Sequence, residues 1–278
     1  MLWSKAATIK INLSSEQNIA RRLYSMTDSK STQLQTKYKI LLIGDNCEDV
    51  YQYGTVDRIS PEAPVPVFKF SHEERRPGMA GNVAKNLEAL GCEVNYLHGE
   101  TSVKTRLIDR RSKQHIVRID NDVTSHPIVF ETAIPKTYDA IVISDYNKGT
   151  VSYDIIEEAI ATKIPVFIDT KKPDLERMQG AWVKINELEY SKIKSECSGL
   201  IVTQGSKGAR AVYHDLELPA PRVEVADVTG AGDTFLAAFA VEFIRHKDLR
   251  SAMEYAIHAA SITVQHFGVY APTQEELQ

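Results

Sequence analysis

The sequence has only three cysteines, Cys47, Cys92 and Cys197, and no two of them are spaced as CxxC. An odd number without that spacing argues against a disulfide framework and a zinc site, and it predicts reduced thiols in a cytoplasmic protein. The chain also has no apolar run of transmembrane length. Its formal net charge of −4 provides no excess of Lys and Arg. We therefore expect neither a membrane nor a nucleic acid as a partner.

Several catalytic signatures are missing as well. The sequence contains no Walker A pattern, no HExxH, no GxSxG and no Cys–His pair. The sequence therefore lacks the residues that P-loop, zincin and serine-hydrolase enzymes need. No internal repeat is present, and 278 residues suffice for one α/β domain with a sizeable core.

Residues 1–37 differ in composition from the rest of the chain. They are rich in Ser, Thr, Gln, Lys and Arg and contain few large apolar side chains. Such a segment buries too little apolar surface to fold by itself, so we interpret it as a flexible extension before a single domain at 38–278. Two alternatives remain open for it, a transit peptide or translation that begins at Met26.

The remaining chain alternates between short apolar runs and segments of helical character. The apolar runs have the length of buried strands, and they lie at 39–44, 92–97, 140–144, 165–169 and 200–203. Helices are predicted at 152–162, with Ser152 as N-cap, at 235–244 and at 249–266. This alternation predicts an α/β fold with a parallel sheet.

Two carboxylates, Asp45 and Asp49, follow the first predicted strand. Open α/β sheets bind ligands at the carboxyl ends of their strands, and a carboxylate can accept hydrogen bonds from several sugar hydroxyls. The alternative, that both are solvated loop acids, is equally compatible with the sequence.

Residues 227–235, DVTGAGDTF, lead directly into the predicted helix at 235–244. Gly230 and Gly232 therefore lie near a helix N-terminus, where free N–H groups and the helix dipole favour an anion such as a phosphate. A carboxylate beside such a site is unfavourable unless it acts as a base, and Asp233 could accept a proton from a hydroxyl that attacks phosphorus. The alternative is an ordinary turn with Asp233 as N-cap.

This stretch, DxxGAGD, resembles the C-terminal motif of the ribokinase-like (PfkB-type) sugar kinases. Residues 58–67, RISPEAPVPV, closely resemble a segment of one branch of that family, the heptose-7-phosphate kinases of lipopolysaccharide-precursor synthesis. The resemblance implies a three-layer α/β/α ribokinase-like fold with a mostly parallel central sheet. It also implies a small β-lid, built from strands at about 50–70 and 104–120. The edges of these strands would leave backbone groups unpaired, which proteins usually cover, so we expect a homodimer joined partly through the lids.

The resemblance also implies roles for residues in matching motifs. The catalytic group consists of Gly230, Ala231, Gly232 and Asp233, with Asp233 as general base. Sugar or sugar-phosphate contacts fall on Asp45, Asp49, Gly78, Asn82, Lys148 and Lys171, the two lysines as phosphate ligands. Nucleotide contacts fall on Asn186, Thr203, Gly205, Gly208 and His258. Glu189 is expected to hold Mg²⁺ through water. ATP and Mg²⁺ are the implied cofactors, and a monovalent cation is a further candidate.

The sequence departs from the family pattern in three places. Met79 occupies the second glycine position of the family's first glycine motif. Only four residues separate Gly99 from Lys104, which is too short for a βα unit, and the region after Glu189 is also shorter than in the family. We expect the N-terminal extension or a partner subunit to cover the sheet after Gly99, or the domain to be less stable than full-length relatives. These departures keep two alternatives open: a non-catalytic sugar- or nucleotide-binding protein, and a kinase for another sugar.

Overall fold

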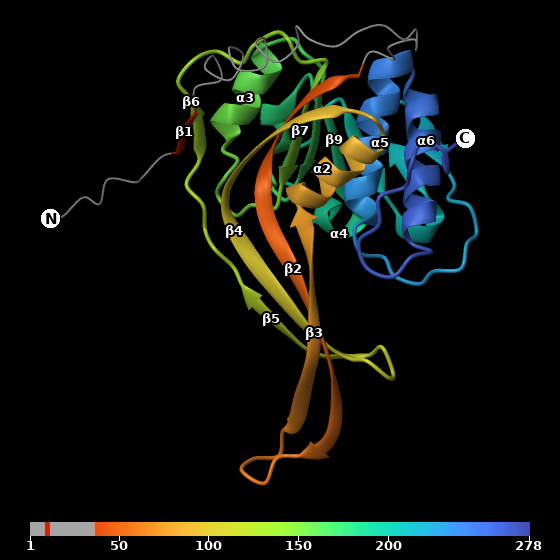
Figure 1. Ribbon diagram of the computed structural model, residues 1–278. Coiled ribbons are helices and arrows are strands. Elements are labelled where there is room, and N and C mark those ends of the chain that lie inside the picture. Colours follow the sequence, from red (N-terminus) through yellow and green to blue (C-terminus); the bar gives the residue numbers. More distant parts are fainter. Residues whose placement is uncertain (1–8, 12–36) are drawn as a thin grey trace, which may run out of the picture.

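The computed structural model describes residues 9–11 and 37–278 (Figure 1). A 10-stranded sheet forms the middle layer of this part of the chain, in the order β12-β11-β10-β9-β8-β7-β2-β4-β5, with β3 paired to β2. Its strands are β2 (Lys39–Ile59), β3 (Pro66–Met79), β4 (Glu93–Asp109), β5 (His115–Asn121), β7 (Ala140–Asp145), β8 (Val166–Thr170), β9 (Trp182–Asn186), β10 (Leu200–Thr203), β11 (Ala209–Ala211) and β12 (Leu216–Leu218). The pairs from β4 through β2 to β10 are parallel, as predicted.

Helices cover both faces of this sheet. One face carries α2 (Ala80–Ala89), α5 (Ala231–His246) and α6 (Leu249–Thr263), and the other carries α3 (Tyr153–Ala161). Short helical turns complete the set: η1 (Leu175–Met178), α4 (Glu187–Tyr190) and η2 (Gly205–Lys207). Ser152 caps α3 as expected, since its side chain accepts from the N–H of Ile155. The three-layer α/β/α fold is therefore confirmed.

The two cores follow from the alternation of side chains along each strand. In β2, Leu42 packs toward α2 and α5, whereas Leu41 and Ile43 pack toward α3. Both sets are fully buried, because successive strand residues point to opposite faces and both faces are covered.

The lid strands are continuations of the central strands, which corrects our prediction. We expected β2 to end at Gly44 and expected separate strands at 92–97 and 104–109. Instead, the parallel β2–β4 pairing runs from Lys39 and Glu93 to Gly54 and Asp109, with one irregularity beside Gly44. Figure 1 shows these strands leaving the helical layers together with β3 and β5 to form the lid. Backbone pairing continues because the partner strand continues, and the sequence of either strand alone does not reveal this.

Strand β3 leads directly into α2. Residues 75–79 are the end of β3, and α2 begins at Ala80. Pro61 and Pro64 lie in the turn between β2 and β3, and Pro66 is the first residue of β3, a strand position that proline tolerates.

The face left without a helix after β4 is covered by this chain itself. Ile128, Phe130 and Ile134 are buried in the core on the α3 side. Strand β6 (Ile128–Phe130) pairs in parallel with β1 (Ile9–Ile11), which belongs to the segment predicted to be flexible. The rest of that predicted extension, residues 1–8 and 12–36, lies outside the described residues.

Candidate active site

The N-terminus of α5 has the backbone conformation that its glycines suggested. Gly230 is the N-cap with φ 83°, in the left-handed region that favours glycine, and no side chain caps the helix there. Asp233 is therefore not the N-cap, which excludes the simple alternative. Its side chain is turned inward, and the residue is only 5% exposed.

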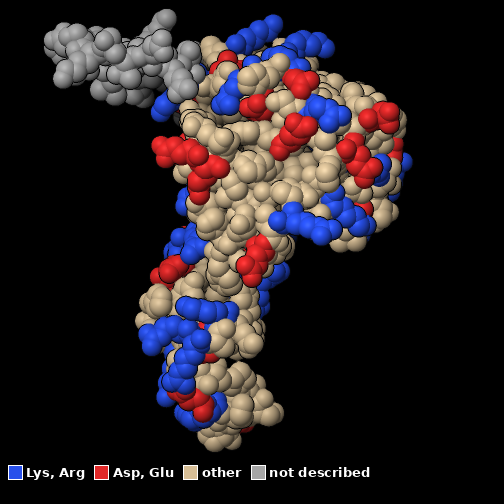
Figure 2. Space-filling model, turned by 90° about the vertical axis from the view of Figure 1, so that its right-hand side faces the viewer, with Lys and Arg blue, Asp and Glu red and all other residues tan. Residues whose placement is uncertain are grey.

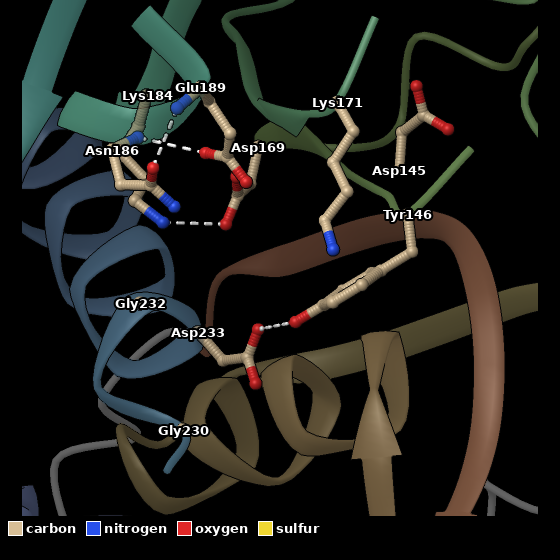
Figure 3. Close-up of a pocket in the computed structure, with 10 residues that line it drawn as sticks. All are labelled: Asp145, Tyr146, Asp169, Lys171, Lys184, Asn186, Glu189, Gly230, Gly232 and Asp233. Atoms are coloured by element: carbon tan, nitrogen blue, oxygen red, sulfur yellow. Dashed lines mark hydrogen bonds and ion pairs between the residues drawn. The ribbon is translucent and has the colours of Figure 1, made fainter. Parts of the chain in front are cut away.

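Both oxygens of the Asp233 carboxylate accept hydrogen bonds. Asn82 Nδ2, from the first turn of α2, donates to Oδ2 at 2.9 Å. The Tyr146 hydroxyl donates to Oδ1 at 2.9 Å (Figure 3). Burial raises the pKa of Asp233 to about 6, although the hydrogen bond from Asn82, the ammonium of Lys184 and the hydroxyl of Tyr146 oppose that rise. A carboxyl group with this pKa is ionised at neutral pH and retains enough basicity to accept a proton.

A small polar cavity of about 200 Å³ opens beside Asp233. Strand ends and the N-terminus of α5 supply its lining: Asp145, Tyr146, Asp169, Lys171, Lys184, Asn186, Glu189, Gly230, Gly232 and Asp233. Asp45, Asp49 and Lys148 do not line it, although they were predicted to share a site with Lys171.

Lys184 and Asp169 form a buried ion pair inside this cavity, with Nζ 2.7 Å from Oδ2. Burial by itself would lower the pKa of Lys184, but the charge and hydrogen bond of Asp169, together with the nearby carboxylates of Asp233 and Glu189, outweigh it, and the pKa is raised. A Cβ at Gly232 would lie 2.8 Å from Lys184 Nζ, so the ammonium rests against the glycine of the helix start. Close approach to Lys184 is thus a second reason for glycine at this position.

Asn186 and Glu189 form a reciprocal capping box at the start of α4. Asn186 Oδ1 accepts from the N–H of Glu189 at 2.8 Å, and Glu189 Oε2 accepts from the N–H of Asn186 at 2.9 Å. Burial raises the pKa of Glu189. Both side chains line the cavity, and Glu189 is the residue predicted to hold Mg²⁺ through water. In residues 9–11 and 37–278, no three His, Cys, Asp or Glu side chains converge as a metal site.

A larger and more apolar cavity of about 680 Å³ adjoins the first at Gly232. Thr203, Gly205 and Gly208, predicted to contact a nucleotide, line it. Helix α6 contributes Ile257, Ala260, Ser261 and Val264. The prediction for His258 is not supported, because its side chain is exposed and does not line the cavity.

Asp45 and Asp49 are buried, which excludes the alternative of solvated loop acids. They are 1% and 5% exposed. Asp45 accepts from the backbone N–H groups of Lys148 and Thr150 at 3.0 and 3.2 Å. Asp49 pairs with Arg106 at 2.5 Å. A Cβ at Gly78 would collide with Asp49 Oδ2, so this glycine is needed where the lid meets α2.

The two predicted phosphate lysines have different environments. Lys148 Nζ is bound to Asp122 at 2.6 Å, which neutralises its charge outside the cavity. Lys171 lines the cavity, with its ammonium 4.6 Å from the centre of the Tyr146 ring. Of these two lysines, only Lys171 lies where it could bind an anion beside Asp233.

Met79 lies at the junction of β3 and α2 with φ 51°. This is the left-handed region, which glycine adopts without strain and a bulky side chain does not. The geometry therefore explains the glycine of the related motif, and Met79 tolerates it while remaining buried.

Four residues that line the small cavity were not predicted from the sequence: Asp145, Tyr146, Asp169 and Lys184. Two features of the sequence could have indicated two of these residues. Lys184 is a charged residue among the apolar residues of its strand, and Asp169 lies near the carboxyl end of a buried strand, where Asp45 was also expected to lie.

None of the helices in residues 37–278 is long and apolar enough to span a membrane.

Comparison with known proteins adds independent information. A family model described as "pfkB family carbohydrate kinase" matches residues 172–276. The bifunctional protein HldE of a Nitratiruptor species is 35% identical over 303 residues, which cover 87% of this chain and 64% of that protein. HldE of Aeromonas hydrophila subsp. hydrophila is 32% identical over 302 residues, with 87% and 63% covered. The chain thus spans somewhat under two thirds of the length of these relatives.

Solved structures share the fold at low sequence identity. Arabidopsis thaliana ribokinase, complexed with ribose and ATP, superposes with a TM-score of 0.64 at 15% identity, covering 87% of this chain and 98% of that chain. Phosphofructokinase-2 from Escherichia coli gives a TM-score of 0.62 at 14% identity, covering 87% and 97%. The fold of this chain is therefore ribokinase-like.

Proposed function

The chain contains a domain of the pfkB family of carbohydrate kinases, and from this premise we propose that it is an ATP-dependent sugar kinase. The proposed reaction transfers the γ-phosphoryl group of ATP to a hydroxyl of a sugar or sugar phosphate. The proposed acceptor class is a heptose 7-phosphate, supported by the resemblance of residues 58–67 to kinases of that substrate. We assign the proposed activity to residues 38–278.

The buried Asp233 at the start of α5 is the observation that carries this proposal. Its carboxylate lies beside the junction of the two cavities, and the hydrogen bonds from Asn82 and Tyr146 fix its orientation. In the proposed reaction, Asp233 takes the proton of the acceptor hydroxyl as its oxygen attacks the γ-phosphorus. The bond to the leaving ADP breaks as the new one forms, and the proton remains on the carboxylate.

The larger cavity suits a nucleotide. Its apolar walls, including Ile257 and Val264, match a planar base, and its inner end reaches Gly232. A triphosphate extending toward Gly232 would meet the free N–H groups of α5, which stabilise negative charge without having to reorient. The ammonium group of Lys184 lies against Gly232, and Lys171 lines the same small cavity, so both add positive charge there.

The residues present fit a magnesium ion held mainly by water and phosphate. Glu189 offers a carboxylate at the cavity wall, and Asn186 supports it, whereas a full set of protein ligands is lacking in the described residues. Mg²⁺ usually keeps several waters and binds substrate phosphates, and it would neutralise phosphate charge during transfer. Glu189 is therefore its proposed contact, through water.

The alternative of a non-catalytic binding protein loses much of its support. It rested on Met79 and on the shortened regions after Gly99 and Glu189. Met79 adopts a positive φ, the backbone conformation that favours glycine, and the sheet face after β4 is covered by the segment containing Ile128 and Phe130. The carboxylate, its two hydrogen-bond donors and the glycine turn are all present, which favours a kinase.

The test is Asp233→Asn beside wild type, with ATP and a panel of sugars and sugar phosphates read by mass spectrometry. Asn keeps the shape and can accept from Tyr146, while the Asn82 amide can flip to accept from it. It cannot take the proton, so turnover should fall by about 10²–10⁴-fold, the usual contribution of a general base. ATP affinity should change little. Wild-type turnover by this variant would exclude Asp233 as the base.

A further inference from the structure

Two lysines in residues 37–278 are buried, and the proposed chemistry uses only one of them. Lys184 lines the small cavity, whereas Lys172, in the segment after β8, does not. Lysine side chains usually lie at the surface, where Figure 2 shows many Lys and Arg side chains of this chain, yet the side chain of Lys172 is only 8% exposed. A charge held in the interior needs partners, and the partners of Lys172 indicate its role.

The ammonium group of Lys172 contacts the residues on both sides of Tyr146. Its Nζ lies 3.0 Å from Asp145 Oδ2, in an ion pair whose carboxylate is fully buried, and 3.4 Å from Asn147 Oδ1. The other oxygen of Asp145, Oδ1, accepts from the backbone N–H of Asn147 at 2.9 Å. These contacts therefore hold the backbone on both sides of the residue that donates to Asp233.

The backbone of this turn has a conformation that needs support. Asn147 has φ 59°, in the left-handed region that few residues other than glycine adopt. Asparagine tolerates this region better than most side chains, and its side-chain oxygen here contacts the Lys172 ammonium. Because the residues before and after Tyr146 are both held, the backbone from which its ring projects is restricted.

Thr170 connects the ion pair to the central sheet. It is directly opposite Asp145 in the parallel pairing of β7 and β8. Its hydroxyl donates to Asp145 Oδ2 at 2.6 Å and accepts from the backbone N–H of Lys172 at 3.0 Å. A buried ion pair contributes little net stability, because both charges lose their water, and its clearest use is to fix one geometry. The geometry fixed here is that of the turn directly after β7, which carries Tyr146.

We propose that Lys172 is a positioning residue for phosphoryl transfer, because its contacts with Asp145 and Asn147 hold the Tyr146 hydroxyl against the proposed base. The inference rests on the proposed function of Asp233. Lys172 does not line the cavity, so it acts through Tyr146, whose hydroxyl stabilises the ionised carboxylate of Asp233. Loss of the Lys172 ammonium should therefore weaken that hydrogen bond and reproduce, in part, the loss of the hydroxyl itself.

The test is a double-mutant cycle between Lys172→Met and Tyr146→Phe, with kcat measured against pH in each protein. Methionine keeps much of the apolar stem of lysine and removes the ammonium. Lys172→Met should lower kcat at pH 6 by up to about fivefold and change it little above about pH 8.5, because Asp233 then loses its ionised form at a higher pH. In the Tyr146→Phe background the same change should have no further effect, because the hydroxyl through which Lys172 acts is absent.

The matched control is Thr170→Val, which removes another hydrogen bond to the same oxygen of Asp145 and leaves both contacts of the Lys172 ammonium. Its pH profile should be that of wild type. The proposal is overturned if the control shifts the profile as Lys172→Met does, if Lys172→Met has the wild-type profile, or if its effect persists in Tyr146→Phe. The last outcome would assign the effect to titration of the unpaired Asp145, which does not need the Tyr146 hydroxyl. If Lys172→Met does not fold, Lys172→Met/Asp145→Asn takes its place in the cycle, because it leaves no unpaired charge in the interior.

A measurement without turnover separates this inference from the proposed function. The carboxyl group of Asp233 is titrated by carbon-13 NMR, and its signal is assigned by its absence in Asp233→Asn. Its pKa, about 6 in the wild type, should rise in Lys172→Met and stay unchanged in Thr170→Val, whether or not a sugar is phosphorylated. The other groups that face this carboxylate are the same in both variants: Asn82 from α2, Asp169 from β8 and Lys184 from β9. An unchanged pKa in Lys172→Met would refute the positioning role even in an active kinase.

Discussion

The hydroxyl of Tyr146 offers a sharp test of how the base is tuned. It donates to Asp233 Oδ1 at 2.9 Å, and Tyr146→Phe removes this donor while keeping the ring. The other groups facing the carboxylate come from three elements: Asn82 from α2, Asp169 from β8 and Lys184 from β9. All three remain in the variant. A change in the pH profile therefore reports the missing hydrogen bond.

The sign of the effect follows from which form the hydrogen bond favours. Burial raises the pKa of Asp233 to about 6, and the hydroxyl of Tyr146 counteracts this by stabilising the carboxylate. Removing it should raise the pKa further. A hydrogen bond to a charged group contributes about 1.5–3 kcal/mol and one pKa unit corresponds to about 1.4 kcal/mol. Because Asn82 still binds the other oxygen, we take the lower end, about one unit.

Activity requires the ionised base, so the acid limb of kcat should move upward by about one pH unit. For a pKa that rises from about 6 to about 7, the ionised fraction falls from about one half to about one tenth at pH 6. It falls from about nine tenths to about one half at pH 7. Relative turnover should therefore recover toward that of the wild type above about pH 8.5.

The assay is kcat against pH for wild type, Tyr146→Phe and a control, Tyr213→Phe. Tyr213 also donates to a carboxylate, that of Glu196, but on the exposed surface. The control should have the wild-type profile. If Tyr146→Phe lowers kcat by the same factor at every pH, its hydroxyl positions the site without tuning the base. An unchanged profile would refute the reasoning altogether.

Three further predictions concern stability, phosphate contacts and assembly. The folded-state pKa of Asp233, about 6, exceeds the ordinary value of about 3.9, so its contribution to stability is complete below about pH 4 and lost as pH rises through 6. The free energy of unfolding in urea should therefore be about 3 kcal/mol higher for Asp233→Asn than for wild type at pH 8, and nearly the same at pH 4. Equal free energies for the two proteins at both pH values would contradict a buried charge at Asp233. Lys171→Ala should lower turnover or raise KM by about tenfold, because a charge-assisted contact is lost. Lys148→Ala should change neither quantity, because Asp122 already binds Lys148. A loss of activity in Lys148→Ala, measured by steady-state kinetics, would contradict this assignment. Exposed apolar side chains on the lid, among them Ile59 and Phe70, predict a homodimer through the lids, and a monomer in sedimentation at micromolar concentration, with and without sugar phosphate, would exclude it.

The sequence alone determined what depends on neighbouring residues. The conformation at Gly230 follows from the two glycines that precede the apolar segment of α5. The cap at Ser152 follows from the position of this polar residue directly before α3. Buried strands such as β7 and β10 were recognisable because an apolar run of that length has few other stable positions. These are local preferences of backbone and side chain, which a single chain segment already expresses.

Only the tertiary structure decided which distant residues meet. Lys184 binds Asp169 because the two residues are opposite each other in the parallel pairing of β8 and β9. Tyr146 binds Asp233 because the residue directly after β7 meets the N-terminal turn of α5. The same holds for β2, which continues past Gly44 because β4 continues beside it. Burial of Asp49, and with it the pairing to Arg106, results from that continued strand. Such contacts depend on the register between segments far apart in the chain, and no local pattern encodes that register.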